Sequence, residues 1–272
     1  MNDPQFQYVQ GQARETFPAL LAAYEAESRA AVAAESCVLH VRYGPLERQT
    51  FDFFAARGRP RGTLAYFHAG YWQSRDKSTF RFIAPAFTAA GLNVALVNYP
   101  LCPDVSLAEL VDATRASVPA IRAHAAAPGG ASPPLVVAGH SAGGHIAVEL
   151  ALSRWPSAPD AIAGIAALSG IFDLVPLVAT TLNDRLRLDE AGAMACSPLH
   201  RVRGGMVPAL IAVGGAETPA FLRQSQRLHK AWTEAGNRSA LHVEAEADHF
   251  SLLRQLASPG SALFASVLGL FD

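Results

Sequence analysis

From about residue 62 onward, the hydrophobic positions of this chain alternate between two patterns. Short, continuous apolar runs have the length of buried strands, and longer segments between them carry apolar residues at helical spacing. Strands that are apolar on both faces indicate a mostly parallel sheet covered by helices on both sides. Strands are predicted at 63–67, 94–97, 135–138, 161–168, 209–213 and 241–243, and helices at 80–90, 106–126, 144–152, 219–235 and from 252 onward.

The first part of the chain has a different pattern. Residues 1–34 are polar and rich in alanine, which predicts a helical leader. Two further strands, 37–41 and 49–54, are expected to form a half-exposed antiparallel pair, so that the sheet has about eight strands. The stretch 171–207 is the least regular, and we expect a small cap-like insertion that forms pocket walls. One α/β domain over 1–272 is therefore predicted.

Composition narrows the class of protein. Half of the 272 residues are hydrophobic, 17% are charged and the net charge is −1, as in a compact globular domain without a basic surface for nucleic acid. No apolar stretch is long enough to span a membrane, and the polar N-terminus lacks a signal-peptide pattern. The three cysteines, Cys37, Cys102 and Cys196, are widely spaced, which argues against disulfides or a cysteine-rich metal site. We expect a cytoplasmic protein; its oligomeric state is left open, with a homodimer as one option.

A nucleophilic serine is the strongest chemical signal. The sequence G-H-S-A-G at 139–143 directly follows an apolar strand and precedes a helix. This strand–turn–helix layout is typical of a nucleophile elbow, in which glycines allow a turn so tight that the serine hydroxyl projects from it. Ser141 is therefore predicted to be the nucleophile.

A serine hydroxyl needs a base, and the base needs an acid. His249 lies just past the last predicted strand, where catalytic side chains collect in open α/β sheets. Glu217 follows the strand at 209–213 and is the predicted acid. Asp173, which follows the strand before it, is the alternative.

The third expected element is an oxyanion hole. The loop after the strand at 63–67 reads H-A-G-Y-W, similar to the glycine-containing loops that donate backbone N–H groups in such enzymes. Gly70 and Tyr71, together with Ala142 after the nucleophile, are the predicted donors. His68 and Trp72 are candidates for the substrate pocket, although Trp72 could equally pack in the core. We predict no metal and no cofactor, because no phosphate-binding loop or metal-ligand spacing is evident.

These motifs resemble the α/β-hydrolase superfamily on the side of the hormone-sensitive-lipase-like esterases, and more closely the serine-type arylformamidases, or kynurenine formamidases. The likeness to the esterases rests on Y-P-L-C-P at 99–103. The likeness to the arylformamidases covers about 62–255 and rests on four segments. They are H-A-G-Y-W at 68–72, G-H-S-A-G-G-H at 139–145, S-G-I-F-D-L at 169–174 and an acidic residue before F-L-R-Q-S at 221–225.

The resemblance implies a triad of Ser141, Glu217 and His249 that cleaves an N-formyl aryl amine such as N-formylkynurenine, a reaction of tryptophan catabolism. Two positions depart from the family pattern. Ala69 replaces a loop glycine, and Glu217 stands where aspartate is usual, which puts the substrate in doubt but removes no chemical group. The alternatives are a short-chain carboxylesterase with broad specificity and a non-catalytic ligand-binding protein on the same scaffold. The expected partner is a small-molecule amide or ester.

Overall fold

The computed structural model describes residues 3–126, 130, 132–155, 158 and 160–272. Within them, eight strands form one sheet in the order β1-β2-β4-β3-β5-β6-β7-β8. Strand β2 is antiparallel to β1 and β4, and every other neighbouring pair is parallel, which confirms the predicted mostly parallel sheet. The strands are β1 (Cys37–Arg42), β2 (Thr50–Phe54), β3 (Gly62–Phe67), β4 (Leu92–Val97), β5 (Leu135–His140), β6 (Gly164–Leu168), β7 (Ala209–Gly214) and β8 (Ser239–Glu244).

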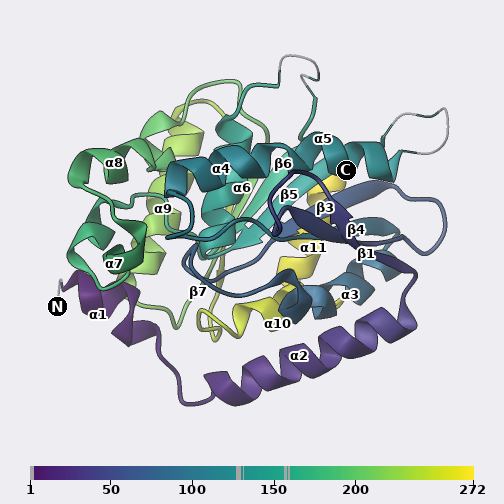
Figure 1. The fold of residues 1–272 in the computed structure, drawn as a ribbon, viewed down its shortest axis with the longest axis horizontal. Helices are drawn as coiled ribbons and strands as arrows, with labels where there is room; N and C mark the ends of the chain where they lie inside the picture. Colours follow the sequence, from purple (N-terminus) through teal and green to yellow (C-terminus); the bar gives the residue numbers. More distant parts are fainter. Residues whose placement is uncertain (1–2, 127–129, 131, 156–157, 159) are drawn as a thin grey trace.

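Helices cover both faces of the sheet (Figure 1). Side chains of one strand point alternately to the two faces, so Ala65 and Phe67 pack with α4, α5, α6 and α9, whereas Leu64 and Tyr66 pack with α3, α10 and α11. The α-helices are α1 (Pro4–Tyr8), α2 (Phe17–Ala34), α3 (Ala84–Ala89), α4 (Leu107–Arg115), α5 (Ser117–Ala125), α6 (Ala142–Leu152), α7 (Asn183–Leu186), α8 (Glu190–Ala195), α9 (Pro219–Glu234), α10 (Leu252–Leu256) and α11 (Ala262–Leu268). The short 3₁₀ helices are η1 (Gln10–Gln12), η2 (Lys77–Ile83), η3 (Val175–Ala179), η4 (Pro198–Arg201) and η5 (Gly269–Phe271).

Three elements differ from the sequence prediction. The helix expected over 80–90 is the 3₁₀ helix η2 followed by the short helix α3. The helix expected over 106–126 is two helices, α4 and α5, which meet at Ala116. Pro119 explains the break, because its ring would clash with the carbonyl of Arg115 in a continuous helix. The third difference is β2, which is buried at every position, whereas β1 alternates. An inner strand covered on both faces has no exposed side, and the ring of His124 packs edge-on against Phe53 at 4.6 Å between centroids.

The helical leader packs against the rest of the fold. Helix α2 runs along one side of the molecule beside α10 and α3 (Figure 1). The Phe17 ring stacks on Phe250 at 3.8 Å, and the Tyr24 hydroxyl donates a 2.8 Å hydrogen bond to the Phe250 carbonyl. The Arg254 guanidinium lies over the Tyr24 ring at 4.6 Å. The leader is therefore held against the segment that follows β8.

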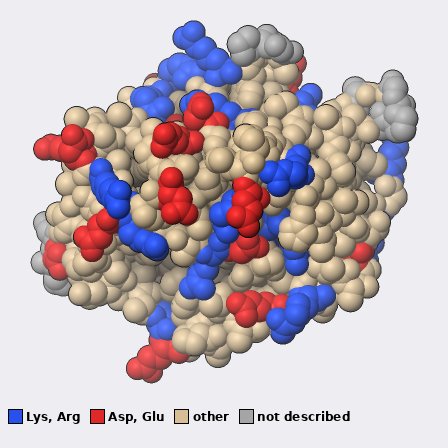
Figure 2. All heavy atoms as spheres, in the orientation of Figure 1, with Lys and Arg blue, Asp and Glu red and all other residues tan. Residues whose placement is uncertain are grey.

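The surface shows mixed charge. On the face in Figure 2, cationic and anionic side chains are interspersed over a largely uncharged surface. Among the described residues, no helix is both long enough and apolar enough to cross a lipid bilayer. The cytoplasmic location and the absence of nucleic-acid partners stay predictions.

Candidate active site

Ser141 occupies a sharp turn between β5 and α6. Its backbone has φ 56° and ψ −118°, a conformation that is strained for a residue with a side chain. A Cβ on Gly143 would overlap the carbonyl oxygen of Phe67, and a Cβ on Gly139 would overlap Gly143 itself. The close approach of β5, α6 and β3 therefore requires glycine at both positions. The turn places Ser141 at the N-terminus of α6, where the helix dipole favours negative charge.

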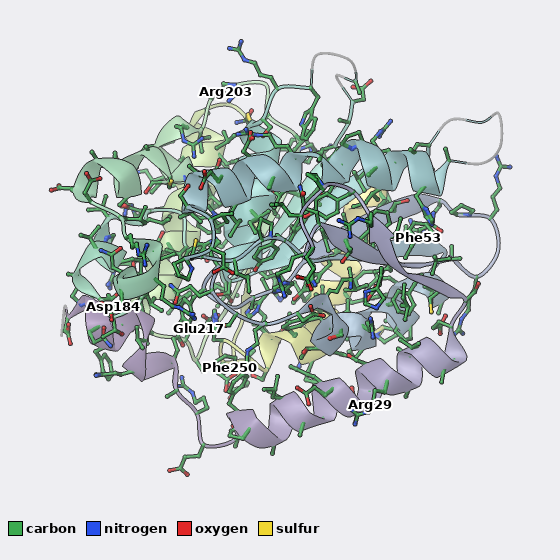
Figure 3. The ribbon with its side chains drawn as sticks, in the orientation of Figure 1. Arg29, Phe53, Asp184, Arg203, Glu217 and Phe250 are labelled. Carbon is green, nitrogen blue, oxygen red and sulfur yellow. The ribbon has the colours of Figure 1, made fainter. Side chains whose placement is uncertain are left out.

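Glu217 and His249 meet beside this turn, although 32 positions separate them in the sequence. The His249 Nδ1 lies 2.8 Å from Glu217 Oε2, and both side chains are almost completely buried. Glu217 follows β7, and His249 follows β8, its parallel neighbour. Since the carboxyl ends of parallel strands share one edge of the sheet, the two loops are adjacent. Figure 3 labels Glu217 and Phe250 in this region.

The Glu217 carboxylate is fixed by further donors. Its Oε1 accepts a 2.8 Å hydrogen bond from the Gly214 N–H and a very short one from the Ser169 hydroxyl. With both oxygens engaged, the carboxylate accepts a hydrogen bond from the N–H at His249 Nδ1. The other ring nitrogen, Nε2, is then the one that can accept a proton from a hydroxyl. Ser169 was not predicted as a site residue. Its position directly after β6, next to the end of β7, was the signal that could have identified it.

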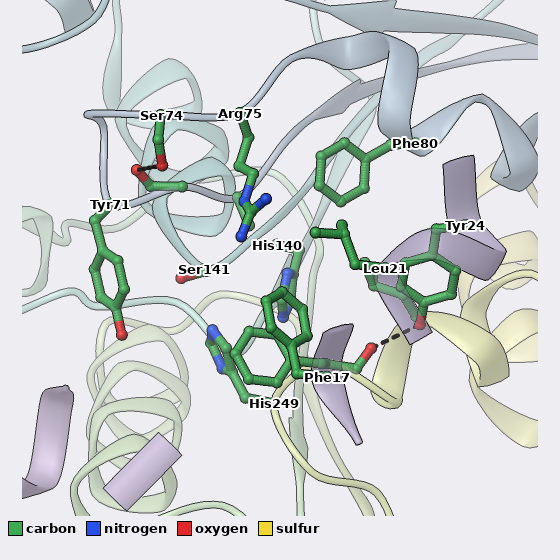
Figure 4. A pocket seen from close by; sticks show the side chains of 14 residues that line it. Phe17, Leu21, Tyr24, Tyr71, Ser74, Arg75, Phe80, His140, Ser141 and His249 are labelled. Atoms are coloured by element: carbon green, nitrogen blue, oxygen red, sulfur yellow. Dashed lines mark hydrogen bonds between the residues drawn. The ribbon is translucent and has the colours of Figure 1, made fainter. Parts of the chain in front are cut away.

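Ser141 and His249 face one pocket of about 210 Å³. Figure 4 shows Ser141, His249 and Tyr71 among the side chains that line this pocket. The structure thus brings together the three side chains predicted to form a triad.

Two of the three predicted oxyanion donors, Gly70 and Tyr71, line the same pocket, and the third, Ala142, directly follows Ser141. Gly70 has φ 135°, and a Cβ there would overlap the Ser74 carbonyl oxygen, so only glycine fits. Tyr71 follows with φ 51°, and its hydroxyl donates a 2.5 Å hydrogen bond to the Tyr8 carbonyl. In the described part of the chain, the N–H groups of Gly70, Tyr71 and Ala142 donate to no backbone or side-chain acceptor, so they are available to an oxygen in the pocket.

Asp173, the alternative acid, lies elsewhere. Its Oδ2 accepts a 2.7 Å hydrogen bond from Arg227, and its Oδ1 lies 3.7 Å from His200 Nε2. The Gln224 side chain accepts hydrogen bonds from the N–H groups of Phe172 and Asp173 and holds this turn in place. The structure therefore pairs His249 with Glu217 and not with Asp173.

Trp72 and His68 do not line the pocket, so their expected role as pocket residues is wrong. Both are fully buried. The indole of Trp72 donates to His145 Nδ1 at 3.3 Å, which anchors the loop to α6. The His68 ring is stacked on Tyr99 at 4.3 Å, and burial lowers its pKa to about 4. Both side chains therefore pack in the interior and hold the loop at 68–72 in place.

The pocket walls come from an unexpected part of the chain. The segment 171–207 contains η3, α7, α8 and η4 and contributes no lining residue, contrary to expectation. Helix α2 supplies Phe17, Leu21 and Tyr24 instead. These positions are spaced as one face of a helix, which is the sequence signal that the leader has a buried side. The helical leader therefore closes the pocket, while 171–207 packs away from it.

His140 is a further lining residue that the sequence did not single out. Its ring lies 4.6 Å from that of His249, and neither of its nitrogens has a hydrogen-bond partner among the described residues. Burial, reinforced by the neighbouring His249, holds the pKa of His140 well below its usual value, so its ring is neutral. In the described part of the chain, no group of three or more His, Cys, Asp or Glu side chains could hold a metal ion.

This fold agrees with the comparisons to known proteins. Residues 64–253 match the family model of the alpha/beta hydrolase fold, so the chain belongs to that family and is a hydrolase. Within it, the chain belongs to the kynurenine formamidase group. It is 30% identical to the kynurenine formamidase of Danio rerio, over 80% of this chain and 76% of that protein. The resemblance predicted from the motifs is confirmed.

Solved structures support the same fold. A proposed thioesterase from Silicibacter sp. TM1040 superimposes with a TM-score of 0.84 at 30% identity, covering 96% of this chain and 97% of that one. An esterase from Pyrobaculum calidifontis has a TM-score of 0.73 at 14% identity, covering 93% and 92% of the two chains. At that lower identity the likeness concerns the fold alone.

Proposed function

We propose that this chain is a serine hydrolase that cleaves an aryl formamide, such as N-formylkynurenine, through a formyl-serine intermediate. The observation that carries the proposal is that Ser141 and His249 line one pocket, with His249 hydrogen-bonded to Glu217 at 2.8 Å. The name of the Danio rerio relative supports the formamide as substrate. A pocket of about 210 Å³, below the roughly 300–1,000 Å³ common for ligand sites, favours a small molecule.

In this mechanism His249 Nε2 takes the proton of the Ser141 hydroxyl, and the oxygen attacks the formyl carbon. The negative charge that forms on the formyl oxygen is stabilised by the N–H groups of Gly70, Tyr71 and Ala142, worth roughly 3 kcal/mol each in comparable sites. Glu217 stabilises the imidazolium. The imidazolium then protonates the leaving nitrogen, and the carbon–nitrogen bond breaks to release the aryl amine. A water molecule, deprotonated by the same ring, attacks the formyl-serine and releases formate.

Release of formate from N-formylkynurenine by the purified protein tests the proposal. The Ser141→Ala variant should lower kcat by a factor on the order of 10⁴–10⁶, because no other group can form the covalent intermediate. Ser266→Ala, which removes a hydroxyl from the outer side of α11, is the matched control and should keep full activity. Undiminished formate release by Ser141→Ala would refute the serine mechanism.

Two alternatives predict different results. A carboxylesterase would hydrolyse p-nitrophenyl acetate efficiently and N-formylkynurenine poorly. The proposed thioesterase among the structural relatives makes ester-type substrates a necessary comparison. A non-catalytic binding protein would hydrolyse neither substrate, and a fluorophosphonate probe would leave Ser141 unlabelled.

A further inference from the structure

Arg75 stands out among the side chains around the pocket. Of the described lining residues it is the only one with a permanent charge, and the lining contains no aspartate or glutamate. The remaining walls are mainly apolar, from Phe17, Phe80 and Phe250. Figure 4 shows the Arg75 guanidinium directed into the pocket between Ser141 and Phe80. A single cation in an apolar pocket gives it a positive potential.

This guanidinium is not neutralised by the protein. Nearby arginines have carboxylate partners, since Arg14 lies 3.8 Å from Asp248 and Arg254 pairs with Glu27. Arg75 forms no ion pair within the described residues, and its recognised contact is the face of the Phe17 ring, 5.4 Å from the centroid. An arginine has five N–H donors in a planar fork that matches a carboxylate. Its donors therefore remain available to a ligand.

The loop holds Arg75 in a defined position. Its backbone has φ 75°, and its carbonyl oxygen accepts a 2.8 Å hydrogen bond from Arg48. Earlier in the same loop, the N–H of Ser74 donates to the Gly70 carbonyl at 3.1 Å. The loop that carries the predicted oxyanion donors therefore also carries Arg75 on a hydrogen-bonded backbone.

We propose that Arg75 binds a carboxylate of the substrate, so that the preferred aryl formamide carries a carboxylate on a side chain of the ring. This inference rests on the proposed function. The ring would lie among the phenylalanine side chains, with the formyl group at Ser141 and the carboxylate at Arg75. Arg75 is thus a specificity residue: it selects the charged substrate and takes no part in bond cleavage.

A matched pair of substrates tests this role. The acid 4-(2-formamidophenyl)-4-oxobutanoate and its primary amide carry the same scissile formamide and differ in the charged group. Because the Arg75 side chain is exposed, the wild-type protein should hydrolyse the acid with a kcat/KM about fivefold higher, the upper end of the effect of an exposed ion pair. Arg75→Gln should remove this preference through KM of the acid, with kcat nearly unchanged and the amide affected less than about twofold.

Two further variants sharpen the test. Arg75→Lys should retain part of the preference, since the charge remains but the fork is lost. Arg29→Gln removes an exposed cation from the outer surface of α2, away from the pocket, and should change neither substrate (Figure 3). Raising the ionic strength should reduce the wild-type preference for the acid. Equal activity on acid and amide in the wild type, or an equal loss on both in Arg75→Gln, would overturn the role of Arg75.

Failure of the formamidase proposal gives a different result. If the wild type hydrolyses p-nitrophenyl esters but neither formamide, the formamide is the wrong substrate. The preference for a carboxylate is then measured with mono-4-nitrophenyl succinate and 4-nitrophenyl butyrate, two esters of which only the first carries a carboxylate. A preference for the succinate that Arg75→Gln abolishes would still support anion binding, and equal rates would refute it.

Discussion

The substitution Glu217→Gln probes the geometry of the candidate triad most sharply. Glu217 Oε1 accepts hydrogen bonds from Gly214 N–H and the Ser169 hydroxyl, so the carbonyl oxygen of a glutamine must take that position. Its NH₂ group then faces His249 Nδ1, 2.8 Å away in the present structure. An NH₂ donor there forces the other imidazole tautomer, with the proton on Nε2. The ring can then no longer accept the proton of Ser141.

We expect Glu217→Gln to lower kcat about 10⁴-fold, or roughly 5.5 kcal/mol of transition-state stabilisation, as for a triad histidine held in the wrong tautomer. The assay is steady-state formate release, with circular dichroism to confirm that the variant is folded. Asp173→Asn is the matched control, because Asp173 pairs with Arg227 and not with His249, and less than a threefold loss is expected. A Glu217→Gln variant with more than a tenth of wild-type activity, or a larger loss in Asp173→Asn, would refute this reasoning.

Two other predictions concern the groups around the triad. Ser169→Ala removes one hydrogen-bond donor to Glu217 and should lower kcat about tenfold, with little change in KM, in the same assay. An unchanged kcat would show that the Gly214 N–H alone holds the carboxylate. Burial lowers the pKa of His68 to about 4 in the folded protein. Between pH 6.5 and 4 the unfolded chain therefore binds more protons than the folded one. The free energy of unfolding should fall by about 3 kcal/mol as the pH drops through this window. Urea unfolding at several pH values measures this loss, which His68→Gln should reduce; an equally steep loss in that variant would assign it to other groups.

Local patterns were sufficient to predict the backbone around Ser141. A tight strand–turn–helix needs glycines at fixed positions, and Gly139 and Gly143 meet that need because their Cα atoms lie against other backbone atoms. The parallel sheet also followed from local sequence, since strands buried on both faces are nearly continuous apolar runs. These features depend on steric limits and periodicities within a few residues, which a sequence states directly.

The choice of acid required the arrangement of strands. Glu217 and Asp173 both follow predicted strands, and local sequence does not distinguish them. In the sheet, β7 is the neighbour of β8, so Glu217 reaches His249, whereas Asp173 follows β6, one strand further away, and pairs with Arg227. The spacing of residues along the chain does not reveal that strand order.

The pocket was the part that only the tertiary structure decided. Its walls come from α2, from the loop that carries Arg75 and from the turn after β8, three segments separated by long stretches of chain. The sequence by itself determined the sheet and the tight turn at Ser141, because these depend on local backbone geometry and periodicity. Long-range packing of apolar faces, such as that of Phe17 on Phe250, decides which helix covers the site and which cation faces the cavity. No local pattern in the sequence specifies which partner such a face packs against.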